Sequence, residues 1–287
     1  RWTGGFTGSR RRWEESMRIT GIDVSRWQGT IDWKKVKAAG IGFAIIRAAA
    51  GLKEDVKFRE NLRGAVAAGI PAGAYLYSLA KTKAEARREA ELLLKLVEGE
   101  ELSYPLVYDI EDEVQAGLSR EARTELVEAF CGKIEAAGRY AMVYGSKSWL
   151  EGYFLPERLN RYDKWVAQWS GKLTYTGSYG IWQQSNTGRV DGIAGNVDLN
   201  VTEKDYPALT ALKKQKWQKK DGKWYYGEIR GSWKKIDGRW YYFGSNGAMA
   251  TGVRKIGGKW YCLAEKTEGP LKEGQCLFTD GSGAISE

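Results

Sequence analysis

The 287-residue sequence contains no histidine. Histidine is the side chain that titrates nearest neutral pH and the commonest zinc ligand. Its absence therefore excludes every histidine-based catalytic triad, every histidine general base and most zinc sites. The three cysteines are too few for a disulfide framework and lack the spacing of metal ligands. We expect Cys131 to be a core residue of a helix, and leave open whether Cys262 and Cys276 pair.

Long apolar segments are also missing. No run approaches the length needed to cross a membrane, so no membrane insertion is expected. The first residues contain glycine, arginine and tryptophan without periodicity and lack the hydrophobic segment of a signal peptide. Residues 1–17 are accordingly interpreted as a leader or linker.

The positive charge is concentrated at one end of the chain. The net charge is +9, and from Lys213 onward fifteen Lys and Arg face eight Asp and Glu. A neutral body with a basic tail indicates an anionic polymer or surface as the partner of the tail. Lysine serving only solubility is an equally good explanation of this charge taken alone.

Short apolar strands alternate with amphipathic helices over residues 18–210, which predicts a parallel sheet with right-handed crossovers. Eight strands favour closure into an irregular TIM-like (β/α)5(β)3 barrel, with a doubly wound open sheet as the alternative. After about residue 145 the helices fade. The expected strands are Ile19–Val24, Phe43–Ala48, Ala72–Leu79, Leu106–Ile110, Tyr140–Gly145, Lys164–Trp169, Tyr179–Gln183 and Val197–Val201; the expected helices are Asp32–Ala39, Lys57–Ala68, Lys83–Val97 and Ser119–Ala137.

The remainder, residues 211–287, is a repeat. Three units begin at Trp217, Trp233 and Val253, and each places aromatic residues around Asp-Gly or Gly-Gly. That dipeptide predicts tight β-hairpins, and a lone hairpin cannot bury its apolar face. We therefore expect a small C-terminal domain of stacked hairpins.

Four acids are expected where strands end. Asp109 and Glu111 are two residues apart and so point to the same face of a strand, while Asp23 and Asp198 lie on the first and last strands. Barrel closure brings strand ends to one rim, where barrel enzymes place their sites. Neighbouring carboxyl groups push their pKa values apart, as glycosidic cleavage requires. Four acids with no cation in the same motifs are a glycosidase-like arrangement, and a hard-cation site of oxygen ligands is an equal alternative.

Aromatic residues are expected at the same rim. Tyr75, Tyr77, Tyr144 and Trp169 can stack on sugar rings and orient them, although alternation makes about half of such residues structural. Isolated acids elsewhere are interpreted only as helix caps or turn residues; these are Asp112, Asp163 and Asp205.

Residues 18–205 resemble glycoside hydrolase family 25, the Chalaropsis-type lysozymes of bacteria and phages. The resemblance implies a muramidase that cleaves the β-1,4 bond between N-acetylmuramic acid and N-acetylglucosamine without a cofactor. It also implies Glu111 as general acid, Asp109 as a stabilising or positioning group, Asp23 and Asp198 as further active-site acids, and Gln183 among the substrate contacts. The matching motifs are Gly21-Ile-Asp-Val-Ser-Arg-Trp-Gln-Gly29, Asp109-Ile-Glu111, Val143-Tyr-Gly-Ser146, Trp165-Val-Ala-Gln-Trp169, Ile181-Trp-Gln183 and Val197-Asp-Leu-Asn200.

The tail resembles the choline-binding repeats of phage endolysins and bacterial surface proteins. This resemblance implies an aromatic cage for a quaternary ammonium, within the first pair of units because the third departs at Val253 and Cys262. Another wall polymer, or packing on the barrel, is the alternative, and nucleic acid is a weaker one. The cage candidates are Trp217, Trp224, Tyr225, Trp233, Trp240 and Tyr241.

Together these features predict an enzyme that acts on bacterial peptidoglycan, either extracellular or released as a phage endolysin. Two rivals stay open at this point. One is a non-catalytic cell-wall-binding or adhesion protein with an inactive barrel. The other is a barrel hydrolase for a different amino-sugar polymer.

Overall fold

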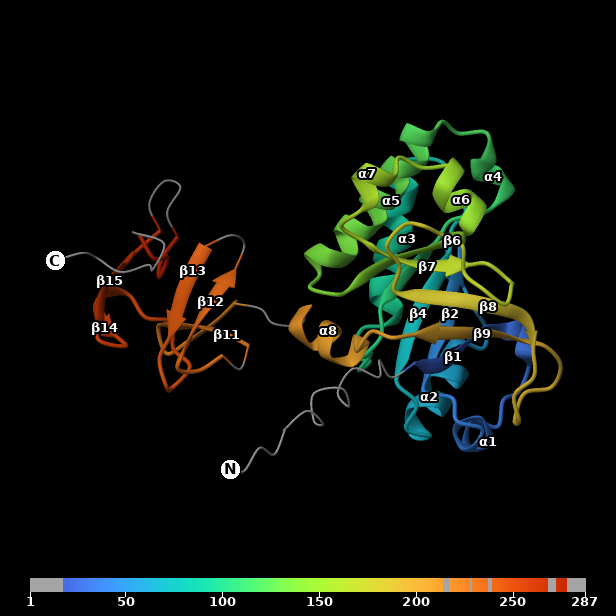
Figure 1. Cartoon of the computed structure of the whole chain (residues 1–287), viewed down its shortest axis with the longest axis horizontal. Helices are drawn as coiled ribbons and strands as arrows, with labels where there is room; N and C mark the ends of the chain where they lie inside the picture. The colour runs from blue at the N-terminus through green and yellow to red at the C-terminus, as the bar shows by residue number, and fades with distance from the viewer. Residues whose placement is uncertain (1–17, 214–216, 228, 237–238, 268–271, 278–287) are drawn as a thin grey trace, which may run out of the picture. The chain divides into compact units, whose positions relative to one another are not determined.

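The computed structural model describes residues 18–213, 217–227, 229–236, 239–267 and 272–277. The chain divides between Leu212 and Lys213 into two compact units, which carry the blue-to-orange and orange-to-red colours in Figure 1. The expected leader, residues 1–17, lies outside the described residues. Among the helices described, none is long and apolar enough to cross a membrane.

The first unit is a closed barrel of eight strands, which confirms the predicted fold class. β1 pairs with β2 on one side and with β9 on the other, closing the ring β1-β9-β8-β7-β6-β5-β4-β2. A two-residue strand, β3 (Lys53–Glu54), extends β2 at its end. The barrel strands are β1 (Ile19–Val24), β2 (Phe43–Ala50), β4 (Ala72–Tyr77), β5 (Leu106–Asp109), β6 (Ala141–Ser146), β7 (Asp163–Ala167), β8 (Ile181–Gly188) and β9 (Val197–Thr202).

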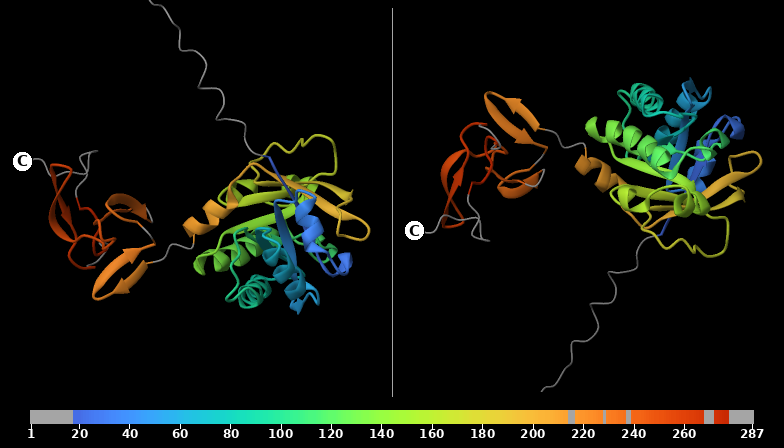
Figure 2. Two further views of the ribbon diagram at one scale, coloured as in Figure 1. Left: turned by 90° about the horizontal axis from the view of Figure 1, so that it is seen from below. Right: turned by 90° about the horizontal axis from the view of Figure 1, so that it is seen from above.

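Several helices begin at residues whose side chains cap them. Thr82 and Glu85 form a capping box at α3, and Ser119 caps α5. In Figure 2, α3 and α5 lie on one side of the barrel and the hairpin β8–β9 on the other. The helices of this unit are α1 (Trp33–Ala38), α2 (Phe58–Ala67), α3 (Lys83–Leu96), α4 (Glu113–Ala116), α5 (Arg120–Ala136), α6 (Lys147–Gly152), α7 (Pro156–Leu159) and α8 (Tyr206–Lys213), with a 3-10 turn at Arg26–Gln28.

Two expectations about this unit were wrong. The sheet is not wholly parallel, because β9 runs antiparallel to both β8 and β1. Helices also do not fade after residue 145, since α6, α7 and α8 all follow. Each is too short to show helical periodicity, but Ser146 caps α6 and Pro156 occupies the first turn of α7.

Strand alternation divides the core into two layers. Inside the barrel, Phe43, Ile45, Val107 and Trp165 pack with other inward-facing residues. Outside it, the opposite faces of the strands pack against the helices, where Cys131 of α5 is fully buried as expected. This inner layer fills the part of the barrel near the start of the parallel strands, so polar side chains that point inward gather at the rims.

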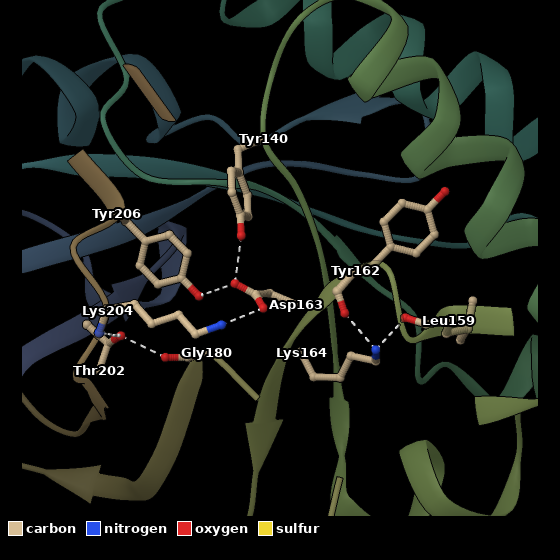
Figure 3. A network of polar contacts seen from close by, with 9 residues as sticks. All are labelled: Tyr140, Leu159, Tyr162, Asp163, Lys164, Gly180, Thr202, Lys204 and Tyr206. Atoms are coloured by element: carbon tan, nitrogen blue, oxygen red, sulfur yellow. Dashed lines mark hydrogen bonds and ion pairs between the residues drawn. The ribbon is translucent and has the colours of Figure 1, made fainter. Parts of the chain in front are cut away.

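Among the acids interpreted as caps, two have that role. Asp112 accepts from the Val114 amide at 2.9 Å, and Asp205 accepts from the Ala208 amide at 3.0 Å. Asp163 does not cap a helix. At the start of β7 it accepts hydrogen bonds from Tyr140 and Tyr206 and pairs with Lys204, as Figure 3 shows. This network joins β7 to α8 at the rim where the parallel strands begin.

The second unit contains three antiparallel hairpins, as predicted. The turn at Asp221 and Gly222 has φ of 51° and 73°, the left-handed pair that a tight type I′ hairpin requires. Leu263 of the third hairpin pairs with Cys276, which follows later in the chain. Because side chains alternate along a strand, Cys262 points to the opposite face from Leu263. The strands are β10 (Trp217–Lys220), β11 (Lys223–Tyr226), β12 (Ser232–Ile236), β13 (Arg239–Phe243), β14 (Gly252–Ile256) and β15 (Lys259–Leu263).

Candidate active site

The four predicted acids meet at one rim of the barrel. Asp109 is the last residue of β5, and Glu111 follows two residues later, beyond the strand. Asp23 of β1 is paired directly with Asp198 of β9. Because β9 is antiparallel, Asp198 lies near the start of its strand, and not at a C-terminal end as barrel parallelism had suggested. The side chains interact electrostatically across the rim: Asp109 with Glu111 and Asp23, and Glu111 with Asp198.

Asp23 is buried and held by two amide side chains. Gln183 donates to Asp23 Oδ2 at 2.9 Å and Asn200 donates to the same oxygen at 2.8 Å. Asn200 is itself fixed by the indole of Trp165, which donates to it at 2.7 Å. Burial raises the pKa of Asp23 well above its usual range, and the neighbouring Asp198 adds to this, while the two amide donors oppose it. The Asp198 carboxyl thus favours the protonated form of Asp23.

Asp109 and Glu111 differ in depth. Asp109 is buried, and its Oδ1 atom has no hydrogen-bond partner among the residues that the structure describes. Glu111 is half-buried, and the Ser146 amide donates to its carboxylate. Burial raises the pKa of both groups, and the charge of Glu111 adds to the rise at Asp109. The pair consequently retains a proton at a higher pH than isolated carboxyl groups would.

The rim also carries a cation, Arg47, that was not predicted from the sequence. Arg47 follows Phe43 and Ile45 on the inward face of β2. Its positive charge opposes the burial and the neighbouring carboxyl groups, which together raise the pKa of Asp109. Asp55, which is buried, fixes the guanidinium through Nε at 2.8 Å and Nη2 at 2.7 Å. The signal available was alternation: an arginine in register with two inward-facing apolar residues.

The predicted substrate contacts occupy distinct positions around the acids. Tyr75 and Tyr144 are buried near them, and burial raises the pKa of both hydroxyls, with the carboxylates adding to the effect. Gln183 accepts from Tyr144 at 3.1 Å and from the Trp169 indole at 3.0 Å, so its oxygen and its amide are both engaged within the site. Tyr77 instead donates to Asp112, the cap of α4, at 2.8 Å. Trp169 is 58% exposed.

The six residues predicted to form an aromatic cage do not all line the same cavity. Trp217, Trp224 and Tyr241 line one cavity of about 350 Å³ in the second unit, with Met249, Arg239, Thr267, Lys272 and Glu273 as further lining residues. Trp217 contacts Trp224 and Tyr241 edge-to-face at 6.2 and 5.0 Å between ring centroids. The other three lie elsewhere: Trp233 packs on Tyr242 and Tyr261, Trp240 is exposed, and Tyr225 does not line the cavity.

Carboxyl groups of raised pKa, gathered on the rim of a barrel beside exposed and buried aromatic residues, define a site of the glycoside hydrolase class. Within the described residues, no group of three or more acidic or cysteine side chains is arranged to hold a metal ion. The chain belongs to glycosyl hydrolase family 25, whose model matches residues 22–193. A second model, the choline-binding repeat, matches residues 229–272.

Individual relatives agree with this assignment. Lysozyme M1 of Streptomyces globisporus is 32% identical over 68% of this chain and 71% of its own. The crystal structure of a bacterial lysozyme from Streptomyces coelicolor is 29% identical, with a TM-score of 0.59, over 68% of this chain and 97% of its own. The autolysin LytC from Streptococcus pneumoniae is 27% identical with a TM-score of 0.59; the match covers 64% of this chain and only 46% of LytC.

Proposed function

We propose that the protein is an N-acetylmuramidase that hydrolyses the β-1,4 bond between N-acetylmuramic acid and N-acetylglucosamine in bacterial peptidoglycan. The observation that carries this is the rim where Asp109 and Glu111 face the pair Asp23 and Asp198. Its family relatives include named lysozymes, and the LytC structure holds a synthetic peptidoglycan ligand. Residues 18–210 form the catalytic domain in this proposal and residues 211–287 the wall-binding domain.

In the proposed mechanism Glu111 donates a proton to the glycosidic oxygen. It is the outer carboxyl of its pair, so the oxygen of a bound sugar can reach it, and its raised pKa keeps it protonated. Asp109 lies deeper; burial and the charges of Glu111 and Asp23 raise its pKa, and Arg47 opposes that rise. In its ionised form Asp109 would stabilise the positive charge that develops at the anomeric carbon. Tyr75, Tyr144 and Trp169 border the sugar-binding surface.

Gln183 and Asn200 have a supporting role in this proposal. Both donors converge on Asp23 Oδ2, so they fix the direction in which the other oxygen of Asp23 points. Since the carbonyl oxygen of Gln183 accepts two further hydrogen bonds, it orients Tyr144 and Trp169 as well. We therefore assign Gln183 to positioning the site, with the sugar contacted by the residues it holds.

The test adds the parent protein, Glu111→Gln and Glu113→Gln to purified bacterial walls and identifies the new reducing ends. Glu113 is an exposed acid on α4 and serves as the matched control. We expect N-acetylmuramic acid ends from the parent and the control, and a loss of about 100-fold or more from Glu111→Gln. Equal clearing by all three would remove Glu111 as the acid. Clearing by none would favour the non-catalytic wall binder, and a different reducing sugar would favour another amino-sugar polymer.

We also propose that the tail cavity binds a quaternary ammonium such as choline. Trp217, Trp224 and Tyr241 present aromatic faces and edges, and Met249 completes an apolar wall. A tail bound to the wall would keep the barrel close to its substrate, which fits action at the cell wall, from outside the cell or after phage-directed release. Trp217→Ala should abolish retention on a choline-substituted resin, whereas Trp260→Ala, in the third hairpin, should leave it unchanged. Equal retention of both variants would remove the cage from the proposal.

A further inference from the structure

The turn after β1 carries an aromatic side chain that is largely exposed among the described residues. Trp27 is 72% exposed. Its backbone is nevertheless fixed, because Ser25 and Gln28 form a capping box: Ser25 Oγ accepts from the Trp27 amide at 3.3 Å, and Gln28 accepts from the Ser25 amide at 2.9 Å. The structure thus presents a large apolar ring to solvent from a turn whose backbone is held by hydrogen bonds.

Two further hydrogen bonds place this turn beside the active site. On one side the Arg26 amide donates to Asp55 at 3.2 Å, and Asp55 is the residue that fixes Arg47 at the acidic rim. On the other side Gln28 donates to the carbonyl of Asn196 at 3.5 Å. Asn196 precedes Asp198 by two residues. The turn therefore lies between the elements that carry Arg47 and Asp198.

One face of the Trp27 indole is already occupied. The guanidinium of Arg26 lies 4.7 Å from the ring centroid, a cation–π contact that restrains the ring. The opposite face remains available to a flat apolar surface. Pyranose rings offer such a surface through their axial C–H bonds, and a polymeric glycan necessarily continues past the acids where it is cut.

We propose that Trp27 is a sugar-stacking platform that binds a pyranose ring of the glycan chain on the Asp23 and Asp198 side of the site. This rests on the proposed muramidase function and adds a binding position to it. The platform contacts a sugar away from the cleaved bond. It should therefore strengthen binding of long chains and leave short fragments, which cannot reach it, unaffected.

The experiment measures binding of soluble peptidoglycan oligosaccharides, from disaccharide to octasaccharide, by calorimetric titration in the Glu111→Gln background. Trp27→Ala should weaken binding of the longest chains about tenfold and leave the shortest ones unchanged, while Trp27→Phe should keep most of the affinity. The control is Tyr179→Ala, an exposed aromatic residue beside the start of β8 at the opposite rim, which should bind every length like the parent. Melting temperatures check that each variant is folded.

Equal affinity of Trp27→Ala and its parent for every chain length would overturn the proposal and leave Trp27 as a contact for another macromolecule. A loss that is the same for all lengths would also overturn it, because the residue would then act within the site. Failure of the muramidase function is distinguishable: the protein with Glu111 intact would then release no reducing ends from walls, whatever residue occupies position 27.

Discussion

Asp163 lies at the rim where the parallel strands begin, and its substitution tests what that rim contributes to stability, separately from catalysis. Tyr140 donates to its carboxylate at 2.8 Å and Tyr206 at 3.0 Å, and Lys204 Nζ lies 2.7 Å away. These four residues come from three places in the chain and meet around the Asp163 carboxylate, as Figure 3 shows. We predict that Asp163→Ala destabilises the barrel without changing the chemistry of the folded enzyme.

The magnitude follows from the surroundings of each partner. Tyr206 is fully buried, so losing its charged acceptor strands a hydroxyl group and costs about 2–3 kcal/mol. Tyr140 is half-buried and can regain water, which reduces its loss to about 1 kcal/mol. The Lys204 side chain is 39% exposed, and a pair of that kind contributes no more than about 1 kcal/mol. The total is about 4 kcal/mol, or a fall of roughly 8–16 °C in melting temperature for a unit of this size.

Calorimetry on the full chain measures the effect as the change in the melting temperature of the first unit. The matched control is Asp205→Ala, which removes only the cap of α8 and should cost about 1 kcal/mol. Wall hydrolysis at 25 °C should be the same for both variants and the parent. A loss below about 1 kcal/mol for Asp163→Ala, or lost hydrolysis with unchanged melting, would refute the reasoning.

The same network fixes the sign of a pH dependence. Burial works to raise the pKa of Asp163, but the hydrogen bonds from Lys204 and Tyr140 outweigh it and the net shift is downward. A carboxyl whose pKa is lower in the folded state stabilises the fold above its unfolded value, near 3.9, and loses that contribution as pH falls through the folded value. The difference between parent and Asp163→Ala should therefore shrink only below about pH 4.

Two further predictions concern the active rim and the core. Burial raises the pKa of Glu111, and the charge of Asp198 adds to the rise. Since Glu111 must be protonated to act as the acid, the rate of hydrolysis should decline as pH rises through the pKa of Glu111. Asp198→Asn should move that decline to lower pH, and a decline at the same pH in both proteins would contradict this prediction. Gly73→Ala should destabilise the barrel by about 1–3 kcal/mol in calorimetry, because a Cβ there would lie 2.7 Å from the Pro105 carbonyl oxygen; Gly171→Ala, with open space, should not, and equal melting of the two would contradict this.

Most of the barrel was predictable because its signals are local. Apolar runs bounded by turn residues identify the strands, and caps such as Ser119 identify the long helices. Strand direction is not local: nothing in Val197–Thr202 says that β9 is antiparallel, because that depends on which neighbours it joins. Asp198 was thus predicted at the correct rim, although the reason given, parallel strand ends, was wrong.

The site was predictable in its acids and not in their partners. A carboxyl pair stands out against an apolar strand, as Asp109 and Glu111 do. Arg47 and Asn200 could not be assigned to the site from the sequence, because they come near the acids only when barrel closure brings β2 and β9 beside β1. In the tail, composition identified the aromatic residues, but pairing register decides which of them share a face, so only Trp217, Trp224 and Tyr241 line the cavity.

The hydrogen-bond and charge partners of the four acids explain how these carboxyl groups coexist at one rim. Burying carboxylates is unfavourable unless each gains donors or shares a proton. Asp23 has two amide donors, and Glu111 has a backbone amide. Asp109 has the charge of Arg47 but no described donor on Oδ1. An unpartnered buried acceptor costs about 1–3 kcal/mol. Because Asp109 Oδ1 is itself shielded from solvent, we expect Asp109 to influence the reaction through the electrostatics of the rim, while Glu111, the outer carboxyl, contacts the substrate.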